Sequence, residues 1–233
     1  MHFPSIRDDI RFILWDWNGT LLDDVSLCLS TINGMLTRRA HPALSVDGYK
    51  EIFRFPVREY YVDAGFDFSY EPFDELAVEF IEGYYGRFAD APLHKDALKA
   101  LESVKKAGLR QGVLSATEDT ILRKTLVDHG VYGYFDQVSG IHNHHADGKL
   151  AAGRKLLQRL PFPQHQVLLI GDTLHDAEVA KELGIHCLLV AQGHQSEKRL
   201  RSSVNDVLPD LDQFILMISN ENHSNPPVPG NYA

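Results

Sequence analysis

The chain has 233 residues, of which 44% are hydrophobic and 24% are charged, as in ordinary globular domains. Its 23 Lys and Arg residues against 32 Asp and Glu residues give a formal net charge of −9, which argues against a nucleic-acid partner. No apolar run is long enough to cross a bilayer, and the first ten residues lack the apolar segment of a signal peptide. Cys28 and Cys187 lie far apart and are expected to be reduced, which is consistent with a cytoplasmic protein. We expect no membrane partner, and either a monomer or a homodimer.

The first structural signal is a short apolar run that ends at a carboxylate. Residues 12–15, Phe-Ile-Leu-Trp, predict a buried strand. Asp16 follows directly, and Asn18-Gly19 then marks a tight turn. An acid at the end of a buried strand lies where open α/β sheets bind ligands, although an ordinary Asp-containing turn gives the same pattern.

The next segment is helical in pattern. Residues 25–37 carry apolar side chains at helical spacing, and Ser45 has the character of a helix start. Aromatic residues recur every three or four positions between Phe73 and Phe88, which indicates an amphipathic helix. No strand pattern interrupts this segment, so residues 24–91 are predicted to form an inserted all-helical unit.

Strands and helices alternate after Pro92. The expected strands are 109–114, 135–138, 167–170 and 185–190, and the expected helices are 97–106, 118–129, 149–160 and 174–183. This alternation predicts an α/β fold with a doubly wound, mostly parallel sheet, built from residues 1–23 and 92–219. The polar, Pro-rich tail, 220–233, is expected to be flexible.

Polar groups follow three of the predicted strands. Asp16 follows the first, Ser115 another, and Asp172 a third, with Asp176 one helical turn later. Strand ends of a parallel sheet share one edge, so these carboxylates would crowd together unless a cation lay among them. Oxygen ligands favour Mg²⁺. A helix cap and first-turn acid would also explain Asp172 and Asp176, but not Asp16.

Lys149 lies 23 residues before Asp172, at the start of a predicted helix. At the same sheet edge, its charge would offset that of a phosphoryl group and of the aspartates. The alternative is a solvated surface lysine. Lys155, further along the same helix, is less well placed.

These residues together resemble the four motifs of the haloacid dehalogenase superfamily. The motifs are Asp16-x-Asn18-Gly19-Thr20, Ser115, Lys149 and Gly171-Asp172-Thr173-x-x-Asp176, in that order. The helical insert resembles the cap of the phosphoglycolate-phosphatase-like branch. The resemblance spans about residues 10–215 and implies a Rossmann-like core.

The resemblance also implies residue roles in a Mg²⁺-dependent phosphatase that acts on a small phosphorylated metabolite, phosphoglycolate-like or a sugar phosphate. Asp16 would be the nucleophile that forms an aspartyl-phosphate. The expected Mg²⁺ ligands are Asp16, the Asn18 backbone carbonyl, Asp172 and Asp176. The phosphoryl oxygens would be held by Thr20, Ser115, Ala116 and Lys149. A carboxylate of ordinary pKa, roughly 4, would need no base to activate it.

Asn18 departs from the pattern, because phosphatases of this superfamily usually carry Asp there as acid and base. An amide cannot shuttle a proton, and such groups contribute about 10²–10⁴-fold to turnover. Two other functions therefore stay open. One is phosphonate cleavage or phosphomutase chemistry, for which Lys50 is the only cap lysine. The other is non-catalytic binding of a phosphorylated ligand, and an engineered Asp-to-Asn change is a further alternative.

A histidine could supply the missing proton transfer, since His titrates near neutral pH. The candidates are His142, His144, His145 and His175, with a polar surface loop as the alternative for the first three.

Two cap arginines, Arg54 and Arg58, could reach an anionic substrate group. They could equally pair with Glu51 or Glu59 on the cap surface. Tyr60 and Tyr61 are expected to be cap core.

Overall fold

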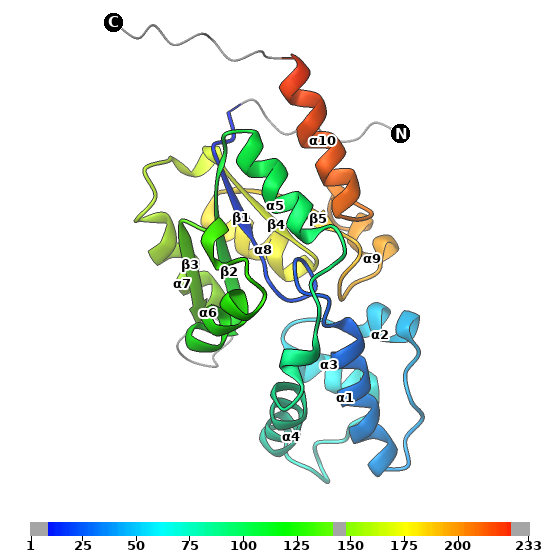
Figure 1. Cartoon of the computed structure of the whole chain (residues 1–233). Coiled ribbons are helices and arrows are strands. Elements are labelled where there is room, and N and C mark those ends of the chain that lie inside the picture. Colours follow the sequence, from blue (N-terminus) through cyan, green and yellow to red (C-terminus); the bar gives the residue numbers. More distant parts are fainter. Residues whose placement is uncertain (1–8, 142–147, 225–233) are drawn as a thin grey trace, which may run out of the picture.

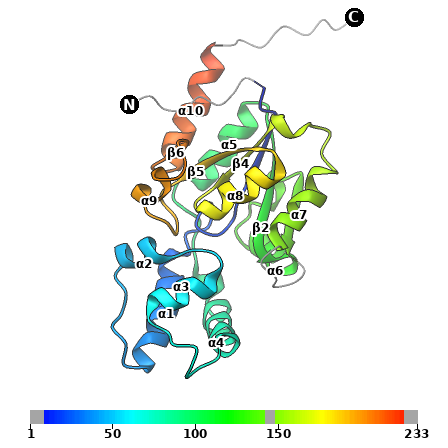
Figure 2. The ribbon, with the colours of Figure 1, turned by 180° about the vertical axis from the view of Figure 1, so that it is seen from behind.

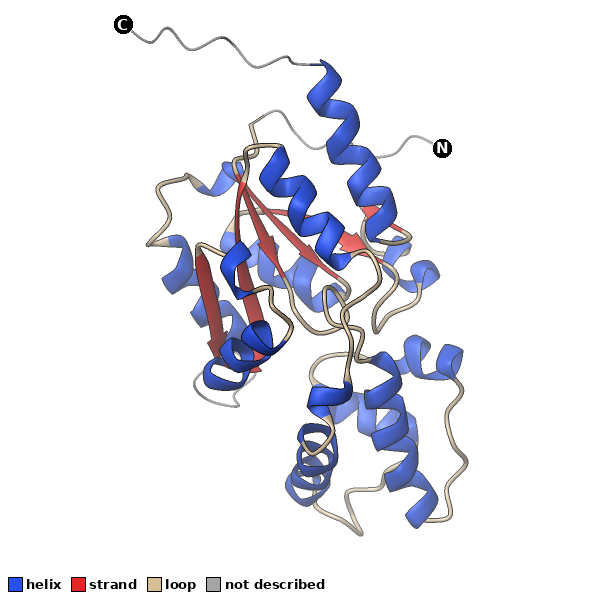
Figure 3. Ribbon diagram, in the orientation of Figure 1, coloured by secondary structure: helices blue, strands red, loops and turns tan. Residues whose placement is uncertain are grey.

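A computed structural model describes residues 9–141 and 148–224 of the chain. Its centre is a six-stranded parallel sheet in the order β3-β2-β1-β4-β5-β6 (Figures 1 and 3). The strands are β1 (Phe12–Trp15), β2 (Arg110–Glu118), β3 (Gln137–Ile141), β4 (Val167–Gly171), β5 (His186–Val190) and β6 (Val207–Leu208). The strand order reverses direction at β1, which makes the ends of β1 and β4 the expected ligand-binding position.

Helices cover both faces of this sheet, as predicted for a doubly wound fold (Figures 1 and 2). Ile13 and Trp15 of β1 belong to a core that includes residues of three helices, α5 (Ala97–Lys106), α6 (Asp119–Asp128) and α10 (Leu211–Ser224). Phe12 and Leu14 point the opposite way, into a core with α7 (Gly148–Leu157) and α8 (Leu174–Leu183). This alternation follows from the two-residue period of a strand, and here both faces are apolar because both are covered. The short helix α9 (Glu197–Arg201) packs near β6.

The segment between β1 and α5 is helical and lies beside the carboxyl edge of the sheet (Figure 1). It consists of α1 (Val25–Arg38), α2 (Val46–Ile52), α3 (Val57–Ala64), α4 (Phe73–Tyr85) and a 3₁₀ turn, η1 (Phe88–Asp90). Ser45 caps α2 by accepting a hydrogen bond from the Gly48 amide. Tyr60 and Tyr61 are buried in its core, as expected from the sequence. We refer to residues 24–91 as the cap.

Several observed elements differ from the predicted ones. Strand β2 continues to Glu118 instead of ending at Leu114, with a register shift between those two residues. Helix α10 continues to Ser224, so the flexible tail predicted from residue 220 was wrong for residues 220–224. The rest of the predicted tail, residues 225–233, lies outside the described residues. The separate helix α3, the 3₁₀ turns η2 (Tyr132–Tyr134) and η3 (Gln164–Gln166), and the elements after β5 were not predicted. No helix between residues 9 and 224 combines the length and apolarity that crossing a bilayer requires.

Replacing Leu14 with Ala should lower the free energy of unfolding by about 2–5 kcal/mol, because the side chain is fully buried on the central strand. Leu216→Ala is the matched control: that side chain is 49% exposed, so its loss should stay within about 0.5 kcal/mol. Urea denaturation of both variants measures the difference. Equal losses would contradict this packing.

Candidate active site

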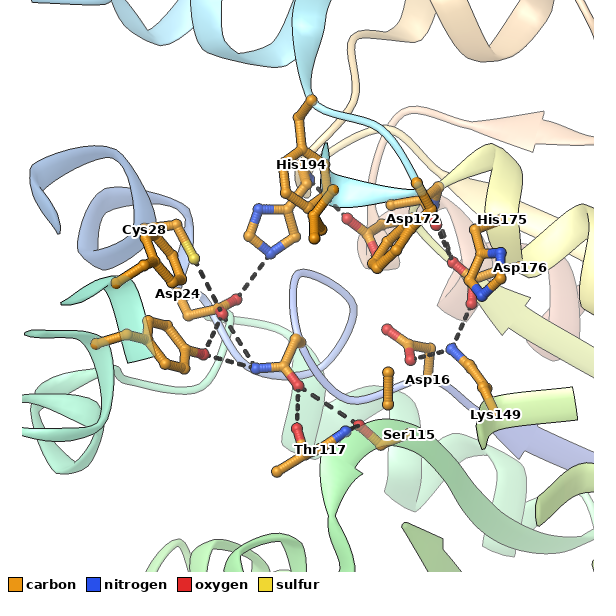
Figure 4. Close-up of a pocket in the computed structure, with 18 of the residues that line it drawn as sticks. Asp16, Asp24, Cys28, Ser115, Thr117, Lys149, Asp172, His175, Asp176 and His194 are labelled. Carbon is orange, nitrogen blue, oxygen red and sulfur yellow. Dashed lines mark hydrogen bonds and ion pairs between the residues drawn. The ribbon is translucent and has the colours of Figure 1, made fainter. Parts of the chain in front are cut away.

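A cavity of about 240 Å³ lies where the carboxyl ends of β1, β2 and β4 face the cap (Figure 4). The sheet side of its lining carries the residues that the sequence singled out, namely Asp16, Asn18, Ser115, Ala116, Lys149, Asp172 and Asp176. Asp24, Cys28 and side chains of α4 line the cap side. The predicted meeting of strand ends from distant parts of the chain is therefore what the geometry shows.

Three carboxylates converge at one end of the cavity. Asp16, Asp172 and Asp176 are all buried, and each offers an oxygen within 4.8 Å of those of the other two. Lys149 Nζ is the cation among them: it forms an ion pair with Asp16 Oδ1 and donates to Asp176 Oδ1 at 2.5 Å (Figure 4). Lys149 is thus a buried lysine of this site and not a solvated surface residue, whereas Lys155 on the same helix is exposed.

Charge in this cluster is unbalanced. With all three carboxylates ionised, they and the Lys149 ammonium would carry a formal charge of −2 within a buried volume. Burial raises the pKa of Asp16 to about 8, with Asp176 and Asp172 adding to the effect and Lys149 opposing it. Burial also raises the pKa of Asp172 to about 6. Burial therefore opposes ionisation of Asp16, and its pKa lies above the ordinary value expected from the sequence.

A divalent cation fits this cluster. Its charge of +2 would balance the −2 of the site, and the available donors are oxygens, as Mg²⁺ prefers. A bound cation also lowers the pKa of neighbouring carboxyl groups, which would return Asp16 to its ionised form. Asp176 is already held as an anion: although burial opposes it, Lys149 and a 2.7 Å hydrogen bond from Thr173 lower its pKa. Thr173, not Asp172, is the N-cap of α8.

Glycines let two loops close around Asp172. Gly19 has a φ of 75°, and a Cβ there would lie 2.3 Å from Asp172 Oδ2. A Cβ on Gly193 would lie 2.1 Å from the same oxygen. The neighbouring amide of His194 donates to Asp172 Oδ2 at 2.6 Å. Thr20 lies within hydrogen-bond reach of both Asp16 and Asp172, each at 3.3 Å, so its hydroxyl braces the carboxylates.

The irregular part of β2 carries the predicted phosphate-binding residues Ser115 and Ala116. Ser115, Ala116 and Thr117 lie within its register shift and line the cavity. Ala116 is exposed there, while Ser115 and Thr117 are buried. The Ser115 hydroxyl accepts a hydrogen bond from the Thr117 amide at 3.0 Å. A bulged strand end of this kind turns side chains and amides toward a ligand instead of toward a neighbouring strand.

The Asn18 side chain is fixed by four hydrogen bonds. Its carbonyl oxygen accepts from Thr117 at 2.6 Å and from Ser115 at 3.4 Å. Its amino group donates to Asp24 Oδ2 at 3.0 Å and to the Tyr84 hydroxyl at 2.8 Å. An ionised carboxylate only accepts hydrogen bonds, so an amide is the group that fits opposite Asp24.

A buried ion pair anchors this network to the core. His194 Nε2 lies 3.1 Å from Asp24 Oδ1, and Tyr84 donates to Asp24 Oδ2 at 2.5 Å. Burial alone would raise the pKa of Asp24, but the charge of His194 and the hydrogen bonds lower it to about 2. Burial likewise opposes charge on His194, yet Asp24 raises its pKa to about 9. Since Tyr49 also contacts His194 Nδ1 at 2.8 Å, the pair ties cap helices to the sheet edge.

The two predicted substrate arginines do not line the cavity. Arg54 pairs with Glu59 at 3.1 Å and with Asp63 at 2.7 Å. The Arg58 guanidinium lies over the Phe68 ring at 4.3 Å. The Arg54–Glu59 pair is the alternative expected from the sequence, whereas Arg58 contacts an aromatic ring instead of a glutamate.

The remaining candidates divide between described and undescribed residues. His175 lines the cavity, and burial lowers its pKa, with the Lys149 charge adding to the effect. His142, His144 and His145 lie outside the described residues. Lys50 donates to the Gln192 carbonyl at 3.2 Å and does not line the cavity.

Asp24, Thr117, Tyr84 and His194 were not predicted as site residues. Asp24 was visible only as the second acid of a pair after Leu22. Tyr84 follows Phe80 by one helical turn, which places the two on one face of α4. His194 carried no local signal, because its partner lies 170 residues away.

Comparisons with known proteins agree with this geometry. The sequence profile of a family described as haloacid dehalogenase-like hydrolase matches residues 13–190. The phosphoglycolate phosphatase of Aliivibrio fischeri is 21% identical over 228 residues, which cover 91% of this chain and 97% of that protein. Tyrosine-protein kinase PtkA of Mycobacterium tuberculosis is 24% identical over 187 residues, 79% of this chain but 63% of that protein.

Solved structures share the fold at low identity. A haloacid dehalogenase-like family hydrolase from Streptococcus pneumoniae superposes with a TM-score of 0.75 at 17% identity, covering 90% of this chain and 99% of the other. The structure of Mycobacterium tuberculosis PtkA superposes with a TM-score of 0.74 at 21% identity, covering 91% and 99%.

The Asp24–His194 pair should make stability depend on pH. His194 has a raised pKa, so its contribution is complete below about 6.5 and is lost as pH rises toward 9. Asp24 has a lowered pKa, so its contribution is lost only as pH falls from about 3.8 toward 2. The stability advantage of the parent over Asp24→Asn/His194→Gln should therefore shrink between pH 6.5 and 9, by at most on the order of 3 kcal/mol.

Urea unfolding at several pH values measures this advantage. His165→Gln, at an exposed position, is the control and should follow the parent. An advantage that stays constant or grows with pH would contradict the pairing.

Proposed function

Because this chain belongs to the haloacid dehalogenase-like hydrolase family, we propose that it is a Mg²⁺-dependent phosphatase. It hydrolyses a small phosphomonoester through an aspartyl-phosphate on Asp16. Relatives named as phosphoglycolate phosphatases support the reaction class.

One observation carries this proposal: three buried carboxylates and a buried lysine meet at the cavity floor with a net charge of −2. A structural ion pair would need only one acid for the lysine. Two further carboxylates in a buried place are costly unless a cation and an anionic substrate complete the site. Strongly perturbed pKa values in a cleft are typical of functional residues.

The chemistry follows from the positions of the side chains. An Asp16 oxygen attacks phosphorus, an O–P bond forms, and the bond from phosphorus to the ester oxygen breaks, with the electron pair leaving on that oxygen. Water then attacks the same phosphorus, the bond to Asp16 breaks, and inorganic phosphate and the Asp16 carboxylate are released. Lys149, beside Asp16, offsets the developing charge. Ser115 and Ala116 line the cavity, and the Ser115 hydroxyl and the Ala116 amide would hold phosphoryl oxygens.

The protein ligands of Mg²⁺ would be the carboxylates of Asp16, Asp172 and Asp176 and the backbone carbonyl of Asn18. When bound, the ion supplies charge neutralisation of the phosphoryl group. The cap covers the site and limits the access of bulk water.

Phosphoryl transfer to an acceptor other than water is the second candidate. Asn18 favours it, because a hydrogen-bonded amide cannot act as the base that takes a proton from an attacking water molecule. A product other than inorganic phosphate would identify it. Phosphonate cleavage has less support, because Lys50 does not line the cavity.

Removing the nucleophile should abolish turnover. With phenyl phosphate and Mg²⁺, Asp16→Asn should release no phosphate above background, and a chelator should stop the parent enzyme. Lys149→Met should lower kcat by about 10²–10³-fold, while Lys155→Met, on an exposed position of the same helix, should match the parent. Phosphate release assays measure all four. Parent-like rates for Asp16→Asn would refute the proposal.

Restoring an acid at position 18 should change both activity and stability. In Asn18→Asp, two carboxylates would face each other, so the free energy of unfolding should fall by about 1–3 kcal/mol. Asn18→Asp/Asp24→Asn exchanges the two groups and should recover part of that loss. The double variant should hydrolyse n-butyl phosphate, a poor leaving group, about 10²-fold or more faster than the parent. Asp24→Asn alone is the control, and no gain over it would contradict the role assigned to Asn18.

A further inference from the structure

The cap wall of the cavity is apolar. Away from Asp24, Cys28 and Tyr84, its lining residues are Phe53, Phe55, Val57, Phe80, Ile81 and Tyr85. Phe55 and Ile81 are each 39% exposed, although both are large and apolar. Exposed apolar surface gathered at a cavity marks a place where an apolar ligand is covered.

This wall reaches the catalytic end of the cavity. The Phe55 ring lies 4.7 Å from the ring of His175, which directly precedes Asp176. The Phe53 ring is 5.7 Å from that of Phe55. A phosphoryl group on Asp16 would therefore carry its organic part against aromatic side chains, whose edges and faces suit a planar ring.

Among the described residues that line the cavity, each cation is already paired, and His194 is held by Asp24. Of the Lys and Arg residues that the structure describes, only Lys149 lines the cavity, and Asp16 and Asp176 already hold it. Arg54 and Arg58 are engaged on the cap surface. A carboxylate or second phosphate bound against this wall would be desolvated without a partner, which costs several kcal/mol.

The cavity is also small. Its volume of about 240 Å³ is below the roughly 300–1,000 Å³ of pockets that hold drug-sized ligands. One ring with small substituents fits this size better than a nucleotide or a peptide does.

Asn18 points to the same class by separate reasoning. An amide at this position cannot protonate the leaving oxygen, which favours a leaving group that is stable as an anion. A phenol with a pKa near 10, as in the Tyr side chain, forms such an anion, whereas an aliphatic alcohol is about as weak an acid as water, with a pKa near 15.7.

We propose that the substrate is an aryl phosphate, the monoester of a single-ring phenol without a second negative charge; this proposal rests on the phosphatase function proposed above. The Asp16 oxygen bonds to phosphorus, the bond from phosphorus to the aryl oxygen breaks, and the phenolate leaves with the electron pair and takes its proton from solvent. This class differs from the phosphoglycolate-like and sugar phosphates expected from the sequence.

Inhibition by non-hydrolysable analogues tests the proposal without the influence of leaving-group reactivity. Benzylphosphonate has the shape of phenyl phosphate, and 3-phosphonopropionate has the shape and charge of phosphoglycolate. With Mg²⁺ present, calorimetry should show benzylphosphonate binding to the parent at least about 10-fold more tightly. Ile81→Arg adds a cation to the wall and should reduce or reverse this preference. Val78→Arg, 54% exposed on the same helix and outside the cavity, should leave it unchanged.

Equal or tighter binding of 3-phosphonopropionate by the parent would overturn the proposal, as would equal effects of the two arginine variants. Phosphate release from phenyl phosphate and phosphoglycolate separates this failure from that of the function. Faster release from phosphoglycolate would overturn the substrate class and leave the phosphatase standing. If benzylphosphonate binds but neither ester releases phosphate, the proposed phosphatase function is overturned. The assignment of an aryl phosphate as the substrate is then overturned as well.

Discussion

Repulsion among three buried carboxylates is the constraint on which the rest of this structure depends. Asp16, Asp172 and Asp176 lie within 4.8 Å of one another at the carboxyl edge of the sheet. Burial, together with the charges of Asp176 and Asp172, raises the pKa of Asp16 to about 8, although Lys149 opposes this shift. The fold supplies the positions through β1, β4 and the first turn of α8, and the close loops at Gly19 and Gly193 hold Asp172 in place. The proposed cation and phosphoryl group would complete a site of this charge.

A second buried network connects this site to the cap. Asn18 follows Asp16 by two residues, and its side-chain amide bridges Thr117 of the sheet to Asp24 and Tyr84 of the cap. The amide at position 18 and the carboxylate at position 24 are complementary, since one donates and the other only accepts. Loss of the usual acid is therefore matched by the surrounding hydrogen bonds and is part of the packing of this site. In the proposed reaction, Asn18 could not donate a proton to the leaving group, which is one of the two grounds for the proposed aryl phosphate.

Local patterns predicted the sheet and the residues at its edge. The bounds of strand β1 could be predicted because its four apolar side chains are followed by Asp16 and a turn. The bounds of α5 and α8 could be predicted because a glycine follows close to the end of each helix. Asp24 and His194 could not be predicted, because their meaning lies in a contact across 170 residues. The four-residue spacing of Arg54 and Arg58 suggested a shared target, but Asp63 and Phe68 compete for them within the cap. The extension of β2 was missed because the polar residues Ser115 and Thr117 resemble a loop in sequence.

The central claim is that Asp16 accepts the phosphoryl group. Acid quenching during turnover of phenyl phosphate with Mg²⁺, followed by borohydride reduction, would convert an aspartyl-phosphate into homoserine. Mass spectrometry of the peptide that contains position 16 reads the outcome directly. The account predicts homoserine at position 16 and unmodified Asp at positions 172 and 176. Phosphate release during the same turnover with aspartate retained at position 16, or with homoserine at another position, would contradict it.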